Sequence, residues 1–192
     1  MTSLSIGDKA PNFDLPRDGG GTLSLKEALS TLKGQKGLVL YFYPKDSTPG
    51  CTTESIGFSE AKAAFEKAGV AIVGASKDSV KRHDNFIAKQ NLTIPLVSDE
   101  DGTLCEDYGV WQEKKNYGRT YMGIVRATFL IKKNGTIAAI WPKVKSMLLK
   151  MSSLRQYLFI MSVDALIEIQ EPGPIKTDLK NMVLEVMEEI SI

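Results

Sequence analysis

Cys51 is the residue of this chain whose sequence context best fits a reactive side chain. It follows a loop-forming segment at residues 44–50, which in turn follows the apolar run 38–43. Residues compatible with a helix begin at Thr52, so the cysteine stands where a buried strand ends, a Pro/Gly loop turns and a helix begins. Free N–H groups and the positive end of a helix dipole stabilise a thiolate at such a position. Because the thiolate is the nucleophilic form of cysteine, we predict a reactive sulfur here.

The elements that must position this cysteine alternate between predicted strands and helices. Buried strands are expected at three apolar runs, residues 38–43, 70–75 and 95–97. Helices are expected between and after them, at residues 52–68, 78–90 and 103–108. Gly69 is the expected stop of the first helix, and Asp78 the expected N-cap of the second.

Two hairpins complete the predicted domain. The first joins residues 13–15 to residues 22–25 through a glycine-rich turn. The second joins residues 127–132 to residues 136–141 through Asn134-Gly135, the strongest short hairpin signal. This order predicts an α/β fold, a thioredoxin-like sandwich with a central mixed β-sheet flanked by helices and an N-terminal hairpin.

The character of the chain changes near Ser146. Two amphipathic segments, at about 154–165 and 179–190, are separated by Pro172-Gly173-Pro174. We therefore predict a thioredoxin-like domain at residues 1–145 and a divergent helical C-terminal extension at residues 146–192. The extension is either a genuine packing segment or the product of a shifted reading frame.

Composition and charge exclude several classes of function. The 192 residues include 24 basic and 23 acidic side chains, so the net charge of +1 attracts neither nucleic acid nor an anionic membrane. The uncharged apolar stretches are all shorter than the roughly 18 residues that span a bilayer. Two cysteines make no disulfide framework and one histidine completes no zinc site. We predict a cytoplasmic protein, a monomer or weak homodimer, without cofactor or metal.

The segment around Cys51 resembles the active-site signature of the peroxiredoxins. Pro44, Thr48 and Cys51 have the spacing Pro-x-x-x-Thr-x-x-Cys, and the wider segment 42–54 is similar to the Q-type branch, also called the bacterioferritin comigratory proteins. Other similar segments lie at residues 7–13, 98–102 and 108–111. The resemblance, which runs from about residue 6 to residue 145, implies a thiol-dependent peroxidase that acts on hydrogen peroxide and organic hydroperoxides.

The chemistry of such an enzyme explains the residue types in the signature. A thiolate attacks one peroxide oxygen, expels hydroxide or alkoxide and becomes a sulfenic acid. Fixed donors must meet the negative charge that develops on the oxygens. Thr48 can place its hydroxyl between the sulfur and the peroxide, and Pro44 can shield the sulfenic acid from further oxidation. Gly50 lets the backbone approach closely.

Arg126 is the expected second donor. The resemblance identifies it as the active-site arginine at the start of the strand before the second hairpin. A guanidinium stays charged, and its fork of donors suits both a thiolate and a peroxide oxygen. The alternative is a surface arginine at a strand edge, and the signature at Cys51 favours the catalytic role.

This chain departs from many members of the branch five residues beyond Cys51. A second, resolving cysteine is common there, whereas this chain has Ile56. Cys105 is the only other thiol, and as a neighbour of Leu104 it is expected to be a buried small hydrophobe rather than a resolving cysteine. A one-cysteine mechanism follows, in which thioredoxin or another external thiol attacks the sulfenic acid.

Two other functional classes share these features. A non-enzymatic peroxide sensor would use Cys51 without fast turnover, and consumption of peroxide in the presence of a thiol separates it from a peroxidase. A thioredoxin-fold interaction module would have lost the site, which the intact set Pro44, Thr48, Cys51 and Arg126 argues against.

Two further polar positions are expected to play no catalytic part. His83, between charged neighbours, is expected on the exposed face of its helix. The acidic residues 99–101 are expected to form a turn before a helix, because no further spaced carboxylates complete a calcium loop.

Overall fold

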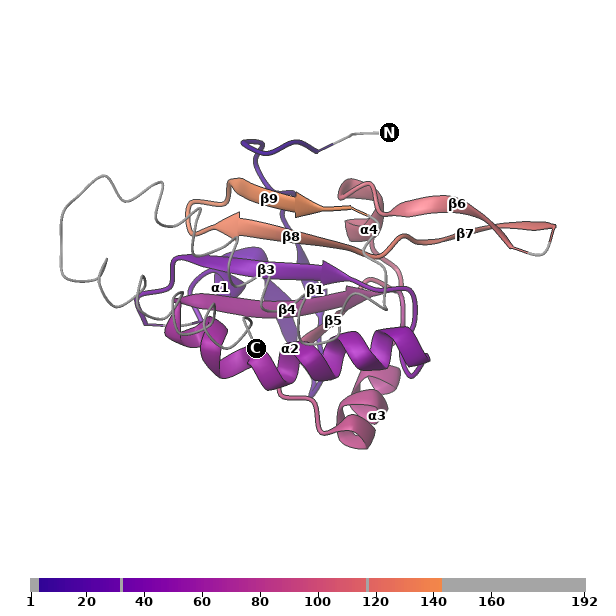
Figure 1. The fold of residues 1–192 in the computed structure, drawn as a ribbon, viewed down its shortest axis with the longest axis horizontal. Helices are drawn as coiled ribbons and strands as arrows, with labels where there is room; N and C mark the ends of the chain where they lie inside the picture. Colours follow the sequence, from indigo (N-terminus) through magenta and orange to yellow (C-terminus); the bar gives the residue numbers. More distant parts are fainter. Residues whose placement is uncertain (1–3, 32, 117, 143–192) are drawn as a thin grey trace, which may run out of the picture. The chain divides into compact units, whose positions relative to one another are not determined.

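The computed structural model describes residues 4–31, 33–116 and 118–142, and the predicted extension at 146–192 lies outside this part. Figure 1 shows the arrangement of its elements. In chain order they are β1 (Asp14–Pro16), β2 (Thr22–Ser24), α1 (Leu25–Ala28), β3 (Gly37–Phe42), α2 (Pro49–Lys67), β4 (Val70–Ser76), α3 (Val80–Gln90), β5 (Leu96–Ser98), α4 (Leu104–Asp107), β6 (Trp111–Asn116), β7 (Arg119–Ile124), β8 (Ala127–Lys132) and β9 (Ile137–Trp141).

A mixed sheet in the order β5-β4-β3-β8-β9 forms the centre of the fold (Figure 1). β3 lies in its middle, parallel to β4 and antiparallel to β8. β4 and β5 are also parallel, while β8 and β9 form the predicted antiparallel hairpin. The N-terminal hairpin is confirmed as well, since β1 pairs antiparallel with β2. The apolar run 38–43 thus supplies the central strand that its two apolar faces require.

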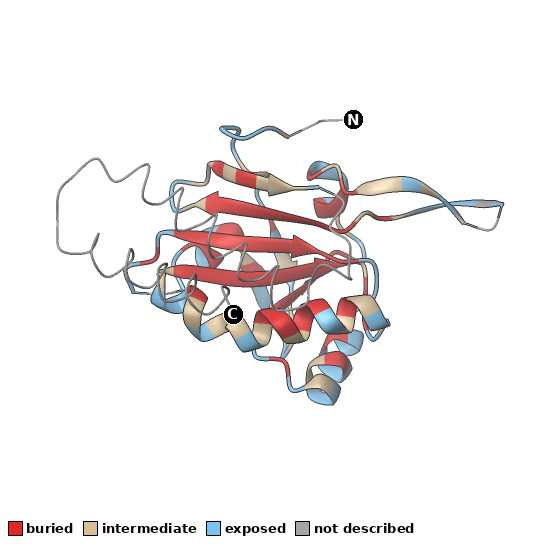
Figure 2. Cartoon of the chain, viewed as in Figure 1, coloured by how far each residue is buried: buried red, intermediate tan, exposed pale blue. Residues whose placement is uncertain are grey.

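Side chains alternate between two layers along β3. The even-numbered residues belong to a core that the N-terminal hairpin, α1 and α4 share. On the other face, Tyr41 contacts Phe58 of α2, and Tyr43 lies against Phe86 of α3. Figure 2 shows β3 and β4 buried between these layers. The predicted arrangement of helices around a mixed sheet is confirmed.

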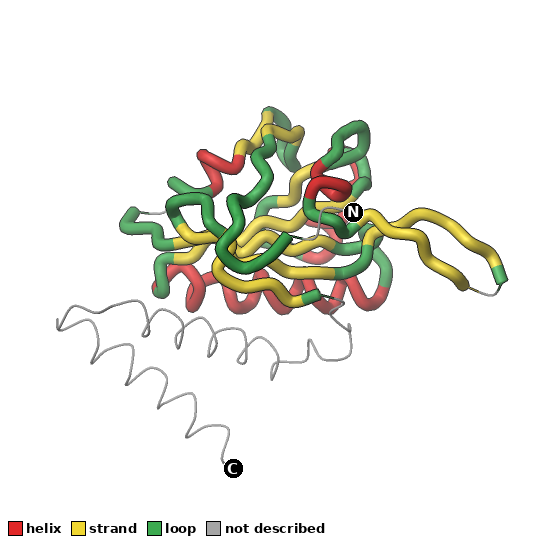
Figure 3. The backbone as a smooth tube through the Cα atoms, turned by 90° about the horizontal axis from the view of Figure 1, so that it is seen from above, coloured by secondary structure: helices red, strands yellow, loops and turns green. Residues whose placement is uncertain are grey.

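The hairpin formed by β6 and β7 was not predicted. Its strands pair from Trp111 with Ile124 to Asn116 with Arg119. Figures 1 and 3 show this arm reaching away from the central sheet. Tyr121 and Met122 are each 49% exposed on it. The strand residues are largely charged or polar, so they lack the apolar alternation by which strands are predicted.

Two helix starts differ from the prediction. α2 begins at Pro49 rather than at Thr52, because proline at the first helical position has a suitable fixed φ and no N–H to satisfy. The N-cap of α3 is Ser79 rather than Asp78. The Asp78 carboxylate instead accepts hydrogen bonds from the backbone N–H of Asp46 and the hydroxyl of Ser76.

Candidate active site

Cys51 lies in the first turn of α2, on the side that faces the sheet. Thr48 is the N-cap, with extended φ and ψ of −86° and 149°, and its carbonyl accepts the first helical hydrogen bond from Thr52. The sulfur is therefore near the end of the helix where N–H groups lack partners within the helix and the dipole is positive. The Cys51 residue is only 1% exposed, so the surrounding protein, rather than bulk water, sets the environment of the sulfur.

Arg126 supplies the hydrogen bond to this sulfur. Its Nη2 atom donates to Cys51 Sγ over 3.1 Å, and the arginine is 9% exposed. It stands in the short connection between β7 and β8, and β8 lies beside β3 in the sheet. The predicted neighbour of Cys51, 75 positions away in sequence, is thus buried beside it and is not a surface residue.

Glu54 is a residue of this site that the sequence analysis did not identify. Its Oε2 atom forms an ion pair with Nη1 of Arg126, and the side chain is buried. One guanidinium therefore joins a carboxylate through one nitrogen and the cysteine sulfur through the other. The spacing carried a signal, because a residue three positions after Cys51 lies on the same face of a helix.

Thr48 and Pro44 frame the loop before Cys51. The Thr48 hydroxyl donates to the carbonyl of Lys45 over 3.0 Å, so it closes the turn within its own loop. Pro44 is exposed at the start of that loop, directly after β3. The structure places both residues on the approach to the helix, and their contacts with a peroxide stay predictions.

Two further side chains, Tyr41 and Lys114, have pKa values that burial shifts. The Tyr41 hydroxyl is 3.0 Å from Ser55 Oγ, and burial raises the pKa of Tyr41. On the arm, half-buried Lys114 donates to the carbonyl of Ile124. Burial lowers the pKa of Lys114, while the negative charge of Cys51 acts in the opposite direction. The arm therefore contributes a cation to the surroundings of the sulfur, which the sequence analysis missed together with the arm itself.

His83 is not where the sequence analysis expected it. The prediction of an exposed position is wrong, since the side chain is fully buried and its ring contacts the carboxylate of Asp46. Charged neighbours suggested exposure, yet His83 precedes the buried Phe86 by three positions and so shares its face of α3.

Cys105 lies apart from Cys51, in α4 and in the core on the opposite face of the sheet. It is fully buried, and burial strongly raises the pKa of its thiol. The carboxylate of Asp99 accepts hydrogen bonds from the backbone N–H groups of Leu104 and Cys105, as a turn that caps a helix would. Both cysteines are free thiols.

Neither a metal cluster nor a membrane span is found in the described ranges. No group of three or more His, Cys, Asp and Glu side chains there is arranged to hold a metal ion. Within the same residues, no helix has both the length and the apolar character needed to cross a membrane.

Comparison with known proteins gives consistent matches over most of the chain. A model of the AhpC/TSA family matches residues 6–140. The chain is 49% identical over 148 residues to peroxiredoxin Bcp of Xanthomonas campestris, which covers 76% of this chain and 89% of the relative. It is also 46% identical over 143 residues to peroxiredoxin Bcp of Bacillus subtilis. That match covers 74% of this chain and 88% of the relative.

A solved structure agrees with these matches. The bacterioferritin comigratory protein of Xanthomonas campestris, studied for its alkyl peroxide reduction activity, superposes with a TM-score of 0.67 at 41% identity. The superposition covers 80% of this chain and 90% of that one.

Proposed function

The chain belongs to the AhpC/TSA family and is a thiol-dependent peroxidase with a thioredoxin-like fold, and on this basis we propose that Cys51 is its peroxidatic nucleophile. The observation that carries the proposal is the hydrogen bond from Arg126 Nη2 to Cys51 Sγ, 3.1 Å long, in the first turn of a helix. A cation and a helix N-terminus together favour an ionised, nucleophilic sulfur.

The reaction at this site has two stages. Cys51 Sγ attacks one peroxide oxygen; the S–O bond forms as the O–O bond breaks, and the departing hydroxide or alkoxide takes up a proton to leave as water or alcohol. The sulfur is oxidised by two electrons to a sulfenic acid. An external thiol then attacks that sulfur, so that water leaves and a mixed disulfide forms. A second external thiol attacks the mixed disulfide, which releases Cys51 as a thiol and joins the two external thiols in a disulfide.

We assign the remaining members of the signature to this first stage. Arg126 stabilises the sulfur and the charge that develops on the peroxide. The Thr48 hydroxyl donates to a peroxide oxygen, for which it must turn from its bond with the Lys45 carbonyl. Pro44, at the mouth of the loop, limits access of a second peroxide to the sulfenic acid.

The nature of the substrate and partners extends the proposal. Because a related protein of Xanthomonas campestris is studied for alkyl peroxide reduction, we assign organic hydroperoxides as well as hydrogen peroxide to this enzyme. Thioredoxin or a comparable thiol is the reductant, and Cys105 takes no part. A cytoplasmic location and a monomer or weak homodimer remain the predictions made from the sequence.

Replacing each cysteine in turn tests the assignment of the nucleophile. Consumption of hydrogen peroxide with thioredoxin or dithiothreitol should be abolished in Cys51→Ser. In Cys105→Ser, the first turnover should keep its wild-type rate, provided that circular dichroism shows an intact fold. Equal losses in the two variants would overturn the assignment of Cys51.

A further inference from the structure

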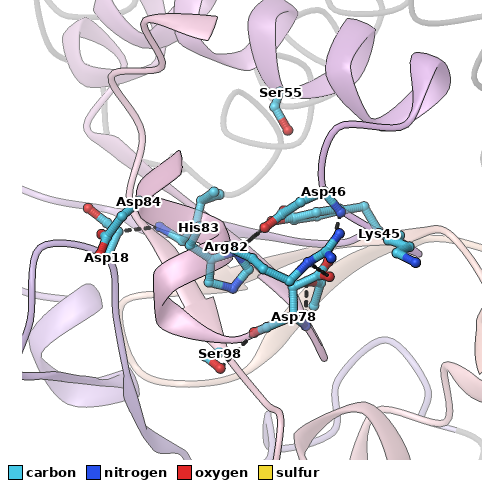
Figure 4. Close-up of polar contacts among 12 residues, drawn as sticks. Asp18, Lys45, Asp46, Ser55, Asp78, Arg82, His83, Asp84 and Ser98 are labelled. Atoms are coloured by element: carbon cyan, nitrogen blue, oxygen red, sulfur yellow. Dashed lines mark hydrogen bonds and ion pairs between the residues drawn. The ribbon is translucent and has the colours of Figure 1, made fainter. Parts of the chain in front are cut away.

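A cluster of polar and charged side chains, most of them buried, lies beside the loop that leads to Cys51, apart from the groups that contact the sulfur. Asp46 comes from the loop, Asp78 follows β4, and Arg82 and His83 belong to the first turn of α3. Figure 4 shows these side chains gathered between the loop and α3. Asp46, Asp78 and His83 are buried, and the peroxidase mechanism given above uses none of the four.

The His83 ring meets an acceptor at each nitrogen. Its Nδ1 atom is 2.8 Å from Oδ2 of Asp46, and its Nε2 atom is 3.2 Å from the carbonyl oxygen of Val97. A carbonyl oxygen only accepts, so Nε2 must carry a hydrogen. A second proton must lie between Nδ1 and the carboxylate.

Asp46 is fixed from three directions. Its Oδ1 accepts from the Tyr43 hydroxyl over 2.7 Å, its Oδ2 faces His83, and its backbone N–H donates to Asp78 Oδ2 over 2.7 Å. The Tyr43 oxygen is also 3.4 Å from His83 Nδ1. Asp78 is in turn paired with Arg82 at 2.6 Å. The Asp46 carboxylate thus faces an imidazole ring, and the Asp78 carboxylate faces a guanidinium group that is partly exposed.

The residue that follows Asp46 in the loop has an energetically unfavourable backbone conformation. Ser47 has a φ of 60°, in the left-handed region that costs a residue with a Cβ atom roughly 1–2 kcal/mol. Thr48 follows as the N-cap of α2, and Cys51 comes one turn later. Such a conformation persists only where the surroundings hold it. The anchored residue next to Ser47 is Asp46.

We propose that His83, acting through Asp46, is a positioning residue for the oxidation of Cys51. The ring ties the loop at residues 44–50 to α3 and to the carbonyl of Val97 in β5, and so holds Thr48 and the first turn of α2 in the reactive arrangement. The inference rests on the proposed role of Cys51. It adds a group that touches neither sulfur nor peroxide.

Two amide variants separate the contacts of the ring. In His83→Asn the amide nitrogen takes the place of Nδ1 and keeps a donor toward Asp46, whereas in His83→Gln it takes the place of Nε2 and keeps a donor only toward Val97. The rate of Cys51 sulfenic acid formation, followed by rapid quench and mass spectrometry, should fall by about 10- to 100-fold in His83→Gln, the scale of a small misplacement. His83→Asn should restore most of that rate. Asn85→Gln, at an exposed position of α3, is the control and should match the wild type.

The protons on the ring can be observed directly, because the chain has a single histidine. In tag-free protein labelled with ¹⁵N-histidine, Nε2 should carry a hydrogen that is bonded to the Val97 carbonyl, and Asp46→Asn should shift the Nδ1 resonance, because it changes the partner of that nitrogen. Because this measurement uses the wild-type residue at position 83, it does not depend on whether a His83 variant folds. It is also independent of whether Cys51 reacts, so an inactive wild type would count against the proposed function alone.

Three results would overturn the inference. These are a wild-type ring whose Nε2 carries no hydrogen, a His83→Gln variant with the wild-type oxidation rate, and equal slowing in His83→Gln and His83→Asn. The last would reduce His83 to a packing residue.

Discussion

At the scale of single residues, the site depends on one guanidinium group that binds two partners. Arg126 pairs with Glu54 through Nη1 and with Cys51 through Nη2. A planar fork can serve both partners at fixed angles, whereas an ammonium group is a single point charge. Because the buried carboxylate holds the fork in place, the charge is aimed at the sulfur before a peroxide arrives. Such prior arrangement is what makes electrostatic stabilisation effective.

Replacing Arg126 should therefore slow the attack of Cys51 on the peroxide. Arg126→Ala is expected to lower the second-order rate constant with hydrogen peroxide by about 100-fold, the scale of losing one such donor. The rate constant of Arg126→Lys should lie between those of the wild type and Arg126→Ala, since one ammonium group cannot keep both contacts. Stopped-flow kinetics measure both. A rate near wild type in Arg126→Ala would place the arginine outside the mechanism.

The stability of the same variants distinguishes catalysis from folding. Arg126→Ala leaves the Glu54 carboxylate buried without its cation, which typically costs about 3–5 kcal/mol. Adding Glu54→Gln removes that charge, so the double variant should regain part of the free energy of unfolding in urea. Its peroxidase rate should stay low, because the donor to the sulfur is still missing.

At the scale of elements, the sequence predicts structure best where burial is continuous. The runs that became β3 and β4 are apolar on both faces and were recognised for that reason. The arm of β6 and β7 has no such pattern, and so it and Lys114 were missed. His83 was misplaced because its partner Asp46 is 37 positions away, and only the fold brings the two together. The contact between Arg126 and Cys51 was reached through the resemblance to a family, not through periodicity.

Gly74 shows how closely the central strands and α2 fit together. A Cβ atom at this position of β4 would lie 2.6 Å from the Tyr41 ring and hydroxyl and 2.7 Å from Leu96. Tyr41 is held by Ser55 of α2, so it has no free direction in which to move. Gly74→Ala should lower the free energy of unfolding by about 1–3 kcal/mol, as overpacking does.

A glycine on the arm provides the control for this prediction. The added Cβ atom of Gly123→Ala would come no closer than 3.3 Å to its nearest neighbour, the ring of exposed Tyr121, which can yield. Urea unfolding of both variants should therefore show a clear loss for Gly74→Ala and a small change for Gly123→Ala. The reverse order would mean that the close contact at Gly74 does not limit the packing.

At the scale of the whole molecule, a buried thiol and a buried phenol make the free energy of unfolding depend on pH in the alkaline range. Burial raises the pKa of Cys105, and also that of Tyr108 in the same core. The folded protein therefore keeps protons that the unfolded chain loses. The stability that this provides is complete below the unfolded pKa, about 8.5 for a thiol, and declines as the pH rises above it.

Cys105→Ala isolates the contribution of the thiol to this decline. Urea unfolding between pH 8 and about 9, below the range in which most tyrosine side chains ionise, should give a free energy that falls with pH in the wild type. The slope should be shallower in Cys105→Ala by up to about 1.4 kcal/mol per pH unit, the value for one proton. Cys51 is present in both proteins and does not enter the difference. Identical slopes would show that Cys105 ionises equally in the folded and unfolded states.

The arrangement of the two layers also determines how the oxidised enzyme is reduced. Cys51 lies in the layer of α2 and Cys105 in the core on the other face, so the central sheet stands between the two thiols. A disulfide requires Cα atoms within about 7 Å, which these elements would reach only by leaving the sheet. Ile56 occupies the position where a nearer thiol would stand. After one equivalent of peroxide, we expect Cys51 to accumulate as a sulfenic acid or, with an added small thiol, as a mixed disulfide.

Peptide mapping under non-reducing conditions measures this outcome directly. The wild type and Cys105→Ser should give the same oxidised Cys51 peptides, because the second thiol takes no part. Higher peroxide should drive both on to sulfinic acid, since no internal thiol traps the first product. A dominant peptide that joins Cys51 to Cys105, and that disappears in Cys105→Ser, would instead mean that α2 or α4 leaves the sheet during turnover. Cys105 would then be the resolving residue, and the separation of the two layers would describe only the reduced enzyme.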